Sequence, residues 1–447
     1  MMSMIEGLHS KGRLVSRRDF LWLTSLSGAG LLFGCATNPV TGKSQLMLIS
    51  EDQEIRTDKQ NSPHQFSLDY GQIQDRDIRT YVDRTGRSLA SHSHRPYLPY
   101  RFMALNATYI NAYAFPGGSV GITRGILLKL KNEAELAALL GHELAHVNAR
   151  HTAEQMSKGT LASLFVAGAA AAVGVRNRGL TDLAATIGML GSGILLAAYS
   201  RDNEREADSL GIDYMVKTGY SPMGMVGLME MLKGLSKKGP SATQVLFATH
   251  PMSDERYQRA LFYSKTRYSK FRNAPLYRER YMDNTRNLRA KAAAILAMQE
   301  GEGAMAKKDY SGAEAWFRKA LKEAPGDYAG LLMLSKALIL QEKYAEALGH
   351  AEEAKGAYPG EAQALHLAGF ARIKLKRYSE AYRDFMAYEK VLPGNPNTIF
   401  FIGLSLEGME KIEQAAEYYH RYLQKVTRGP YARYAYRRLV EWGYYRK

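Results

Sequence analysis

The sequence of 447 residues contains a single cysteine, Cys35. One thiol cannot form an intramolecular disulfide, so the fold must be held by its apolar core or by a metal. Dense basic runs are also missing: Lys and Arg outnumber Asp and Glu by 60 to 44, for a net charge of +16, but they are scattered. This charge bears on solubility and on acidic partners, and we expect no binding of nucleic acid.

The composition is otherwise that of a globular protein. Hydrophobic residues make up 46% and charged residues 23%, so most of the chain is expected to fold. The length exceeds that of one typical core and predicts two or three domains.

Residues 1–34 have the pattern of an export signal, in which basic residues precede the apolar stretch Phe20–Phe33. This stretch is too short to span a membrane comfortably. Residues 16–21, Ser-Arg-Arg-Asp-Phe-Leu, resemble a twin-arginine signal. An ordinary basic signal on the general secretory route is the alternative.

The apolar stretch ends in Leu-Phe-Gly-Cys35, which resembles a lipobox. In a lipobox the cysteine carries the lipid and becomes the mature N-terminus. A chance cysteine in a signal helix is the alternative. We expect Cys35 to be lipidated, and Ala36 after it favours the outer membrane.

The stretch from residue 132 to residue 159 predicts one helix. Asn132 is a typical N-cap with Glu135 in capping-box position, and Gly159 is a plausible end. Apolar residues recur between them at helical spacing: Leu136, Leu139, Leu140, Leu144 and Val147.

This predicted helix carries His142, Glu143 and His146. The two histidines are about 40° apart around the axis, so their imidazoles can share one tetrahedral zinc. Glu143 lies about 100° from His142, where it can reach a water but not readily the metal. His151 would lie about 180° from His142 on a continuous helix, which excludes it as a ligand. Ordinary surface or core histidines are the alternative.

A second acidic pair, Glu204 and Asp208, has the same four-residue spacing. Glu204 can complete a His₂Glu zinc site with an open fourth position. Asp208 can accept a hydrogen bond from a ligand imidazole and fix its tautomer. The alternative is a solvated helix in which Arg201 and Arg205 form salt bridges with these carboxylates.

Together the two motifs resemble the gluzincin peptidases related to HtpX and the CAAX-prenyl endopeptidase. Three further stretches agree with this group: Asn38–Gly42, Asn111–Gly118, and Thr249–Pro251 with Arg256. They are similar to the periplasmic members, the β-barrel assembly-enhancing proteases. The resemblance covers residues 35–270, and the repeats described below extend it.

The resemblance implies that His142, His146 and Glu204 bind one Zn²⁺ and that Glu143 is the general base. Asp208 and His250 are grouped with the catalytic residues. His250 can stabilise the oxyanion or fill the fourth zinc position, and a structural histidine before Pro251 is the alternative.

The resemblance also implies an edge strand that pairs with extended substrate, because a bare edge binds any extended peptide through its backbone. Arg256 is grouped with this strand as substrate-binding. The residues of the strand and its turn are Asn111, Ala112, Tyr113, Ala114, Phe115, Gly117 and Gly118.

Two apolar segments, Gly159–Val175 and Leu183–Tyr199, separate the two motifs. Both are shorter than the roughly 20 residues of a typical membrane span and are rich in Ala and Gly. We expect a helical hairpin that packs on the catalytic domain or plugs its cleft. Membrane spans, as in HtpX-like relatives, are the alternative.

The C-terminal third repeats with a period of 34 residues. This period, with a Tyr-x-x-Ala pattern, resembles tetratricopeptide repeats, whose concave surface binds peptides or proteins. Four repeats at about 293–428 and a capping helix at 429–447 are expected. The recurring positions are Pro325, Pro359 and Pro393; Tyr310, Tyr344, Tyr378 and Ile412; and Ala313, Ala347, Ala381 and Ala415.

The expected fold is mainly α with a small β-sheet, an α+β gluzincin peptidase domain followed by an all-α tetratricopeptide-repeat solenoid. The expected domains are a signal peptide at 1–34, a zinc metallopeptidase at 35–270, a connector at 271–292, and the repeats with their capping helix at 293–447.

The expected function is zinc-dependent endoproteolysis of misfolded or stalled envelope proteins. The protein would be periplasmic and lipid-anchored. It would act on polypeptide substrates and bind envelope or outer-membrane assembly proteins through its repeats. A repeat-based chaperone or scaffold with little proteolysis and an integral-membrane peptidase are the alternatives. The complete set of predicted ligands and base favours the enzyme.

Overall fold

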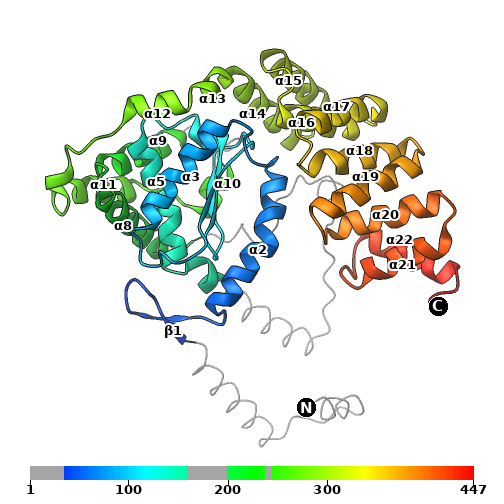
Figure 1. Ribbon diagram of the computed structural model, residues 1–447, viewed down its shortest axis with the longest axis horizontal. Coiled ribbons are helices and arrows are strands. Elements are labelled where there is room, and N and C mark those ends of the chain that lie inside the picture. Colours follow the sequence, from blue (N-terminus) through cyan, green and yellow to red (C-terminus); the bar gives the residue numbers. More distant parts are fainter. Residues whose placement is uncertain (1–34, 159–198, 237–243, 447) are drawn as a thin grey trace, which may run out of the picture.

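A computed structural model describes residues 35–158, 199–236 and 244–446 (Figure 1). The export signal expected at 1–34 lies outside these residues, as do the apolar segments of 159–199 apart from Tyr199. Within the described ranges, no helix combines the length and the apolarity that crossing a membrane requires.

The N-terminal part combines helices with two small sheets. A hairpin of β1 (Cys35–Thr37) and β2 (Ser44–Leu46) precedes the rest. The elements up to the first motif are α2 (Glu51–Leu68), α3 (Arg76–Ala90), β3 (Arg101–Leu105), β4 (Ala112–Ala114), β5 (Ser119–Thr123), α4 (Arg124–Leu127) and α5 (Glu133–Asn148). Those after residue 199 are α8 (Arg201–Lys217), α9 (Met223–Ser236), α10 (Gln244–Thr249), α11 (Asp254–Lys265) and the 3₁₀ turn η4 (Ser269–Phe271).

The larger sheet has the order β3-β5-β4, with β3 parallel and β4 antiparallel to β5. Strands β4 and β5 lie on either side of the turn formed by Pro116, Gly117 and Gly118. Glycine is needed in this turn: Gly118 has φ +106°, and a Cβ on Gly117 would lie 2.7 Å from that of Asp58.

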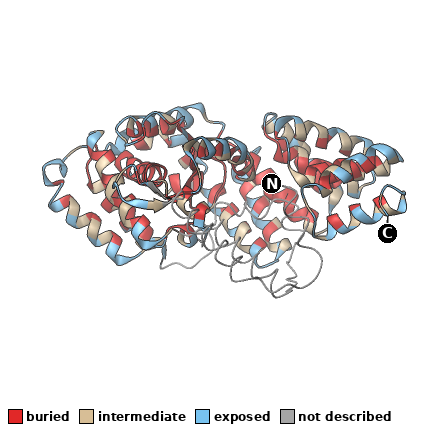
Figure 2. Ribbon diagram, turned by 90° about the horizontal axis from the view of Figure 1, so that it is seen from below, coloured by how far each residue is buried: buried red, intermediate tan, exposed pale blue. Residues whose placement is uncertain are grey.

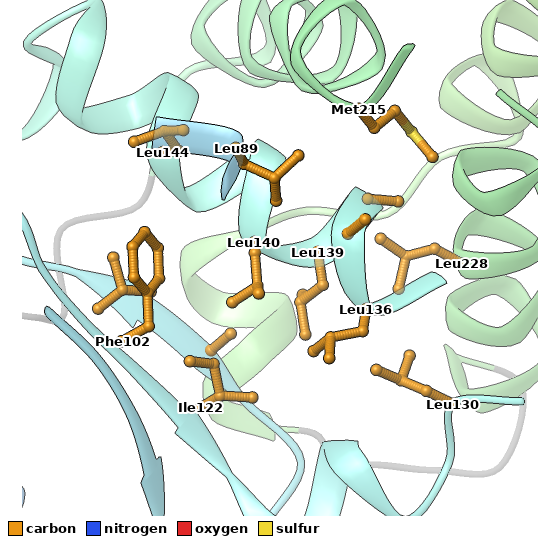
Figure 3. Packing of buried hydrophobic residues seen from close by; sticks show 14 of the residues in the cluster. Leu89, Phe102, Ile122, Leu130, Leu136, Leu139, Leu140, Leu144, Met215 and Leu228 are labelled. Carbon is orange, nitrogen blue, oxygen red and sulfur yellow. The ribbon is translucent and has the colours of Figure 1, made fainter. Parts of the chain in front are cut away.

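Helix α5 is the centre of this part, and all its residues are buried. It packs against α3, α8, α9 and the sheet. Figure 3 shows its leucines, among them Leu136, Leu140 and Leu144, meeting side chains from these neighbours. The predicted N-cap is confirmed, since the Asn132 side chain accepts from the Glu135 N–H.

The predicted end of this helix at Gly159 is wrong. Helix α5 ends at Asn148, Arg150 has φ +61°, and a separate helical stretch begins at residue 151. The Arg150 guanidinium donates to Glu54 and to the backbone oxygen of Ile49, both at 2.8 Å. These contacts with distant residues stabilise a break that the local sequence does not signal.

The expected connector is helical and packs on the N-terminal part. It contains α12 (Arg278–Asn284) and α13 (Arg286–Ala290). The Tyr281 side chain is fully buried and donates to the backbone oxygen of Leu127 at 2.6 Å. The connector therefore leads the chain across α5 and α3 into the repeats.

The C-terminal part consists of helix pairs stacked in a row, followed by a last helix (Figure 1). This confirms the expected fold class. The helices are α14 (Ala292–Ala306), α15 (Tyr310–Glu323), α16 (Tyr328–Leu340), α17 (Tyr344–Ala357), α18 (Gln363–Lys374), α19 (Tyr378–Val391), α20 (Pro396–Gly408), α21 (Ile412–Leu423) and α22 (Pro430–Glu441).

The 34-residue period is also visible in the backbone and in the packing of the helix pairs. A left-handed residue ends the first helix of each pair, at Lys308, Glu342, Lys376 and Glu410. The four recurring alanines are fully buried. In three pairs a glycine on the first helix faces an aromatic ring on the second: Gly301 and Phe317, Gly369 and Phe385, Gly403 and Tyr419. The second pair has Ser335 and Ala351 at these positions, so a larger residue accompanies a smaller one.

Buried residues occur in both parts of the molecule (Figure 2), and buried polar side chains pair between the two parts. Arg124, at the start of α4, donates to both carboxylate oxygens of Asp327 at 2.7 and 3.0 Å. Ser67 of α2 donates to Glu361, and Lys336 of α16 lies 4.6 Å from the centre of the Tyr70 ring. The repeats are therefore held against α2 and the sheet that borders the predicted site.

Candidate metal centre

Three segments that are distant in sequence bring four buried side chains together. Helix α5 supplies His142 and His146, the first turn of α8 supplies Glu204, and the residue after α10 is His250. One potential ligand atom from each lies within 4.8 Å of all the others. Each of these residues is at most 5% exposed, so the cluster is closed off from bulk solvent.

The distances within the cluster are short. The Nε2 atoms of His142 and His146 are 3.1 Å apart. Glu204 places one carboxylate oxygen 3.4 Å from His146 Nε2 and the other 3.6 Å from His142 Nε2. His250 Nδ1 is 3.0 Å from Glu204 Oε1 and 3.3 Å from His142 Nε2.

Two local features that the sequence analysis missed position these residues. Helices α5 and α8 cross at Gly141 and Gly211, where a Cβ on Gly141 would lie 3.0 Å from the backbone oxygen of Gly211. A capping box between Ser200 and Asn203 fixes the start of α8, which places Glu204 in its first turn. The glycine on each of the two helices that carry the motifs was the sequence signal that could have predicted this crossing.

Asp208 and Arg256 lie directly behind the cluster. Asp208 Oδ1 is 3.0 Å from His142 Nδ1. Arg256 donates to both oxygens of Asp208 at 2.8 and 2.7 Å, and its Nη1 is 2.7 Å from Glu204 Oε2. Asp208 therefore acts on the cluster through His142 and is a positioning residue rather than one that faces the ligand atoms.

This arrangement places Arg256, which was expected to bind substrate, among the carboxylates behind the cluster. Its side chain is only 5% exposed, and its N–H groups are taken up by Asp208, Glu204 and the backbone oxygen of Pro251. A guanidinium held in this way orients the two carboxylates and has no free edge for a peptide.

The electrostatics match these contacts. Burial opposes ionisation of Glu204, but the charges of His250 and Arg256 hold its pKa well below the usual range. Burial also opposes ionisation of Asp208, and the Arg256 guanidinium still lowers its pKa. Burial lowers the pKa of His146 well below its usual range, so its imidazole is neutral. The Glu204 carboxylate and the neutral His146 imidazole are therefore in the forms that bind a metal.

Glu143 stands beside the cluster without joining it. Its Oε1 is 3.8 Å from His250 Nε2, and its buried Oε2 has no protein partner among the described residues. Burial raises the pKa of this carboxyl group. A buried carboxylate oxygen without a partner, next to a group of ligand atoms, is suited to accept a proton from a water.

The donor set fits a zinc ion. The 3.0 Å approach of Asp208 Oδ1 to His142 Nδ1 favours a proton on Nδ1, which leaves the lone pair of that imidazole on Nε2, facing Glu204 and His146 Nε2. Two imidazole nitrogens and one carboxylate are a known catalytic zinc set, and His250 offers a fourth nitrogen. Lone pairs that converge in a buried space repel one another unless a cation lies between them.

Two further residues contact His146. The Tyr199 ring stacks on its imidazole, with centroids 3.8 Å apart, and the Tyr199 hydroxyl is 2.9 Å from Thr152 Oγ1. His151 Nδ1 is 3.0 Å from His146 Nδ1. His151 was expected to lie on the opposite side of a continuous helix from His142. The break at Arg150 instead turns its ring back toward His146.

The segment expected to bind substrate borders this centre. Strand β4 is an edge of its sheet and packs on α5. Tyr113 pairs with Gly121 of β5, so the backbone groups of Ala112 and Ala114 point away from β5. Phe115 and Tyr113 pack on Phe66 of α2 and are buried.

The flanks of β4 are fixed by backbone hydrogen bonds. Asn111 exchanges bonds with Thr123, and Phe115 donates to the backbone oxygen of Ser119 at 2.8 Å. Gly117 and Gly118 form the turn to β5. The structure thus presents a short strand edge that packs on the helix of His142 and His146.

Comparison with known families also indicates a peptidase. Residues 78–262 match Peptidase family M48, and residues 306–383 match Anaphase-promoting complex, cyclosome, subunit 3. Residues 78–262 form a peptidase family M48 domain. His142, Glu143, His146, Glu204 and His250 all lie within this M48 domain, and the second match lies within the helical repeats.

Several curated proteins are similar to the M48 domain. The β-barrel assembly-enhancing protease of Escherichia coli K12 is 29% identical over 194 residues, 41% of this chain and 38% of that protein. A putative β-barrel assembly-enhancing protease of Vibrio cholerae is 32% identical over the same shares. Metalloprotease YcaL of Escherichia coli is 34% identical over 161 residues, 36% of this chain and 60% of that protein. Each match spans less than two thirds of the relative's length.

Proposed function

We propose that this protein is a zinc-dependent endopeptidase of the cell envelope that cleaves misfolded or stalled proteins. The observation that carries the proposal is the convergence of His142, His146 and Glu204 in one buried cluster, beside a Glu143 oxygen that has no hydrogen-bond partner among the described residues. A decayed centre in a chaperone or scaffold would not need all four groups. The match to Peptidase family M48 supports the same reaction class.

In this proposal His142, His146 and Glu204 hold one Zn²⁺ per chain. When bound there, the ion would act as a Lewis acid that polarises the scissile carbonyl and lowers the pKa of the attacking water. Glu143 accepts the proton of the attacking water and delivers it to the leaving amine. Asp208 orients His142, and Arg256 orients Asp208 and Glu204.

Substrate binds as an added strand. The backbone groups of Ala112 and Ala114 that point away from β5 can pair with an extended peptide. Such pairing reads the backbone and not the side chains, which fits a peptidase of broad preference. The segment Asn111–Gly118 then sets the direction in which the peptide crosses the centre.

His250 has two candidate roles, and one variant separates them. If His250 fills the fourth zinc position at rest, His250→Ala raises cleavage of a short fluorogenic peptide. If His250 stabilises the developing oxyanion, the same change lowers cleavage, by about 10²–10³-fold in the strongest case. The zinc content of both proteins must be equal for the comparison to hold.

The direct test uses protein without residues 1–34 and with Cys35→Ser, which prevents lipidation. Metal content and casein cleavage are measured before and after chelation and after Zn²⁺ is restored. One zinc per chain and cleavage that is lost and regained support the proposal. Cleavage that is insensitive to chelator, or protein that binds no zinc, contradicts it.

The repeats are proposed to recruit polypeptide substrates or envelope assembly proteins. Deleting 293–447 would also uncover Arg124 and Tyr70, which contact Asp327 and Lys336 of the repeats, so substitutions on the outer repeats α18–α21 are the cleaner test. They are expected to slow cleavage of large clients and to leave short peptides unaffected. Equal slowing of both would remove recruitment from the proposal.

The proposed location is the periplasm, with a lipid anchor on Cys35 directed to the outer membrane. Cys35→Ala is expected to release the protein from membranes under carbonate extraction, and retention would favour an integral-membrane peptidase. Arg17→Lys combined with Arg18→Lys is expected to block export by the twin-arginine route. Normal export of that variant would indicate the general secretory route.

A further inference from the structure

The turn of the N-terminal hairpin is built around one buried side chain, that of Asn38. Its Oδ1 accepts from the backbone N–H groups of Val40 at 2.8 Å and Thr41 at 3.2 Å. The Asn38 N–H donates to the Lys43 oxygen, and Gly42, with φ +70°, donates back to the Asn38 oxygen at 3.0 Å. With its oxygen committed to the turn, the Asn38 amide nitrogen is aimed at the body of the protein.

That nitrogen begins a chain of polar contacts leading to the metal centre. Asn38 Nδ2 donates to Glu206 Oε1 at 3.3 Å. Glu206 Oε2 is 3.3 Å from His151 Nε2. His151 Nδ1 is 3.0 Å from Nδ1 of His146. Both histidines are almost completely buried, at 1% exposure or less, so water does not replace the contact between them.

The proton positions along this chain follow from the groups themselves. The Glu206 carboxylate can only accept, so His151 presents its Nε2–H to it. A neutral imidazole protonated on Nε2 has a lone pair on Nδ1, and His151 therefore accepts the Nδ1–H of His146. This leaves the lone pair of His146 on Nε2, which faces His142 and Glu204.

The same hairpin holds His151 in place mechanically. Gln45 Nε2 donates to the backbone oxygen of Ala149 at 3.3 Å, at the break after α5. The Leu48 N–H donates to Ser157 Oγ at 2.9 Å. These contacts hold the chain on either side of His151 against the hairpin and the residues that follow it.

The geometry points to Asn38, Glu206 and His151 as positioning residues, which hold His146 in the tautomer that binds metal and thereby set the metal affinity of the centre. They serve His146 as Asp208 and Arg256 serve His142. This inference rests on the proposed function, and it gives the Asn38–Gly42 motif a role in the centre although it lies more than 100 residues before His146 in the sequence.

The test measures Zn²⁺ affinity by equilibrium competition with a chromophoric chelator, on the chain without residues 1–34. His151→Leu removes the acceptor and keeps a side chain of similar size. We expect its affinity to fall about 10- to 100-fold. His151→Asn places an amide oxygen near the former Nδ1 and is expected to restore affinity to within about threefold of the wild type.

Two remote variants keep the inference falsifiable if His151→Leu does not fold. Glu206→Ala and Asn38→Ala are expected to weaken Zn²⁺ binding in the same direction, with Glu206→Ala the stronger. Asp202→Ala, at an exposed position of the same helix, is the matched control and is expected to leave affinity unchanged. The absorption spectrum of bound Co²⁺ should change in the two remote variants and not in the control.

Thermal melting of the metal-free proteins separates positioning from a general loss of structure. If the role is positioning, His151→Leu and His151→Asn melt alike without metal and differ in Zn²⁺ affinity. Wild-type affinity in both His151→Leu and Glu206→Ala, together with lost affinity in Glu204→Gln, overturns the inference and leaves the proposed function standing. A wild-type protein that binds no Zn²⁺ overturns both.

Discussion

Helices α5 and α16 are both buried along almost their whole length, but the polar side chains on the two helices differ in their partners. In α16, Ser335 donates to the Ala347 oxygen, and Lys336 lies against the Tyr70 ring and hydroxyl. In α5, Glu143 keeps a buried oxygen without a partner. His142 and His146 direct their nitrogens at one another and at a carboxylate.

The difference separates polar groups that hold a fold together from those that carry out chemistry. At the start of α16 the buried Asp327 has a complementary charge, that of Arg124. Around α5 the acceptors exceed the donors that face them, which destabilises an empty site and favours a bound cation. Substitutions in the two regions should therefore affect different measurements.

The largest effect is expected in α5. Glu143→Gln keeps the shape of the side chain and removes its ability to take a proton, so cleavage should fall by about 10²–10⁴-fold. Zinc content and thermal stability should change little, since Glu143 is not among the clustered ligand atoms. A variant that keeps more than a tenth of the wild-type turnover would remove Glu143 from the mechanism.

The junction beside α16 should respond through stability and not through chemistry. Asp327→Ala removes the carboxylate that caps α16 and leaves the Arg124 charge buried without its partner, which should cost about 3–5 kcal/mol in denaturant unfolding. Asp309→Ala removes a cap of the same kind at the exposed start of α15, and should cost only about 1 kcal/mol. Equal costs would mean that the Arg124 pair adds nothing to the cap.

Close packing in the repeats gives a smaller effect. Gly369→Ala would place a Cβ 2.8 Å from the Phe385 ring, so we expect a loss of about 1–3 kcal/mol although Ala favours helices. The matched control is Gly349→Ala, on an exposed helical position with open space around it, which should stabilise by about 0.5–1 kcal/mol. If both changes stabilise, the pairing of glycine with an aromatic ring is not what sets the repeat spacing.

The smallest effect concerns pH. Burial raises the pKa of Glu302 to about 7, despite the hydrogen bond from Thr108 and the charges of Lys336 and Arg124. The stability contributed by the protonated form is complete below the unfolded pKa near 4.5 and is lost as the pH rises through about 7. Glu302→Gln avoids this loss.

The melting temperature of Glu302→Gln relative to the wild type should therefore rise between pH 5 and pH 8. We expect the corresponding difference in the free energy of unfolding to be about 1 kcal/mol, because part of the carboxyl group still contacts solvent. Glu323→Gln, at an exposed position of α15, is the control and should give a flat difference. A difference that falls with pH would contradict the buried, protonated state of Glu302.

Much of this architecture is local and could be predicted. The four-residue spacing of His142 and His146 and the 34-residue period follow from helix geometry and repetition. The end of α5 could not be predicted, because it depends on Arg150 reaching Glu54 and Ile49. The position of Arg256 behind Asp208 depends in the same way on α11 packing against α8.

The contacts of the first motif show the same limit. Asn38 stood out as part of a recognisable stretch, but its contact with Glu206 joins residues far apart in the chain. His151 was placed on the wrong side because one left-handed residue redirects everything after it. Spacing predicts which residues share a helix face, and only tertiary packing decides which faces meet.

The central claim is that His142, His146 and Glu204 hold a zinc ion between them. The most direct measurement is a crystal of the purified protein examined with X-rays on both sides of the zinc absorption edge. The account predicts one anomalous peak per chain, about 2.0–2.1 Å from the Nε2 atoms of His142 and His146 and within bonding distance of the Glu204 carboxylate. No peak at this position in zinc-loaded crystals, or a peak bound by other residues, would contradict it.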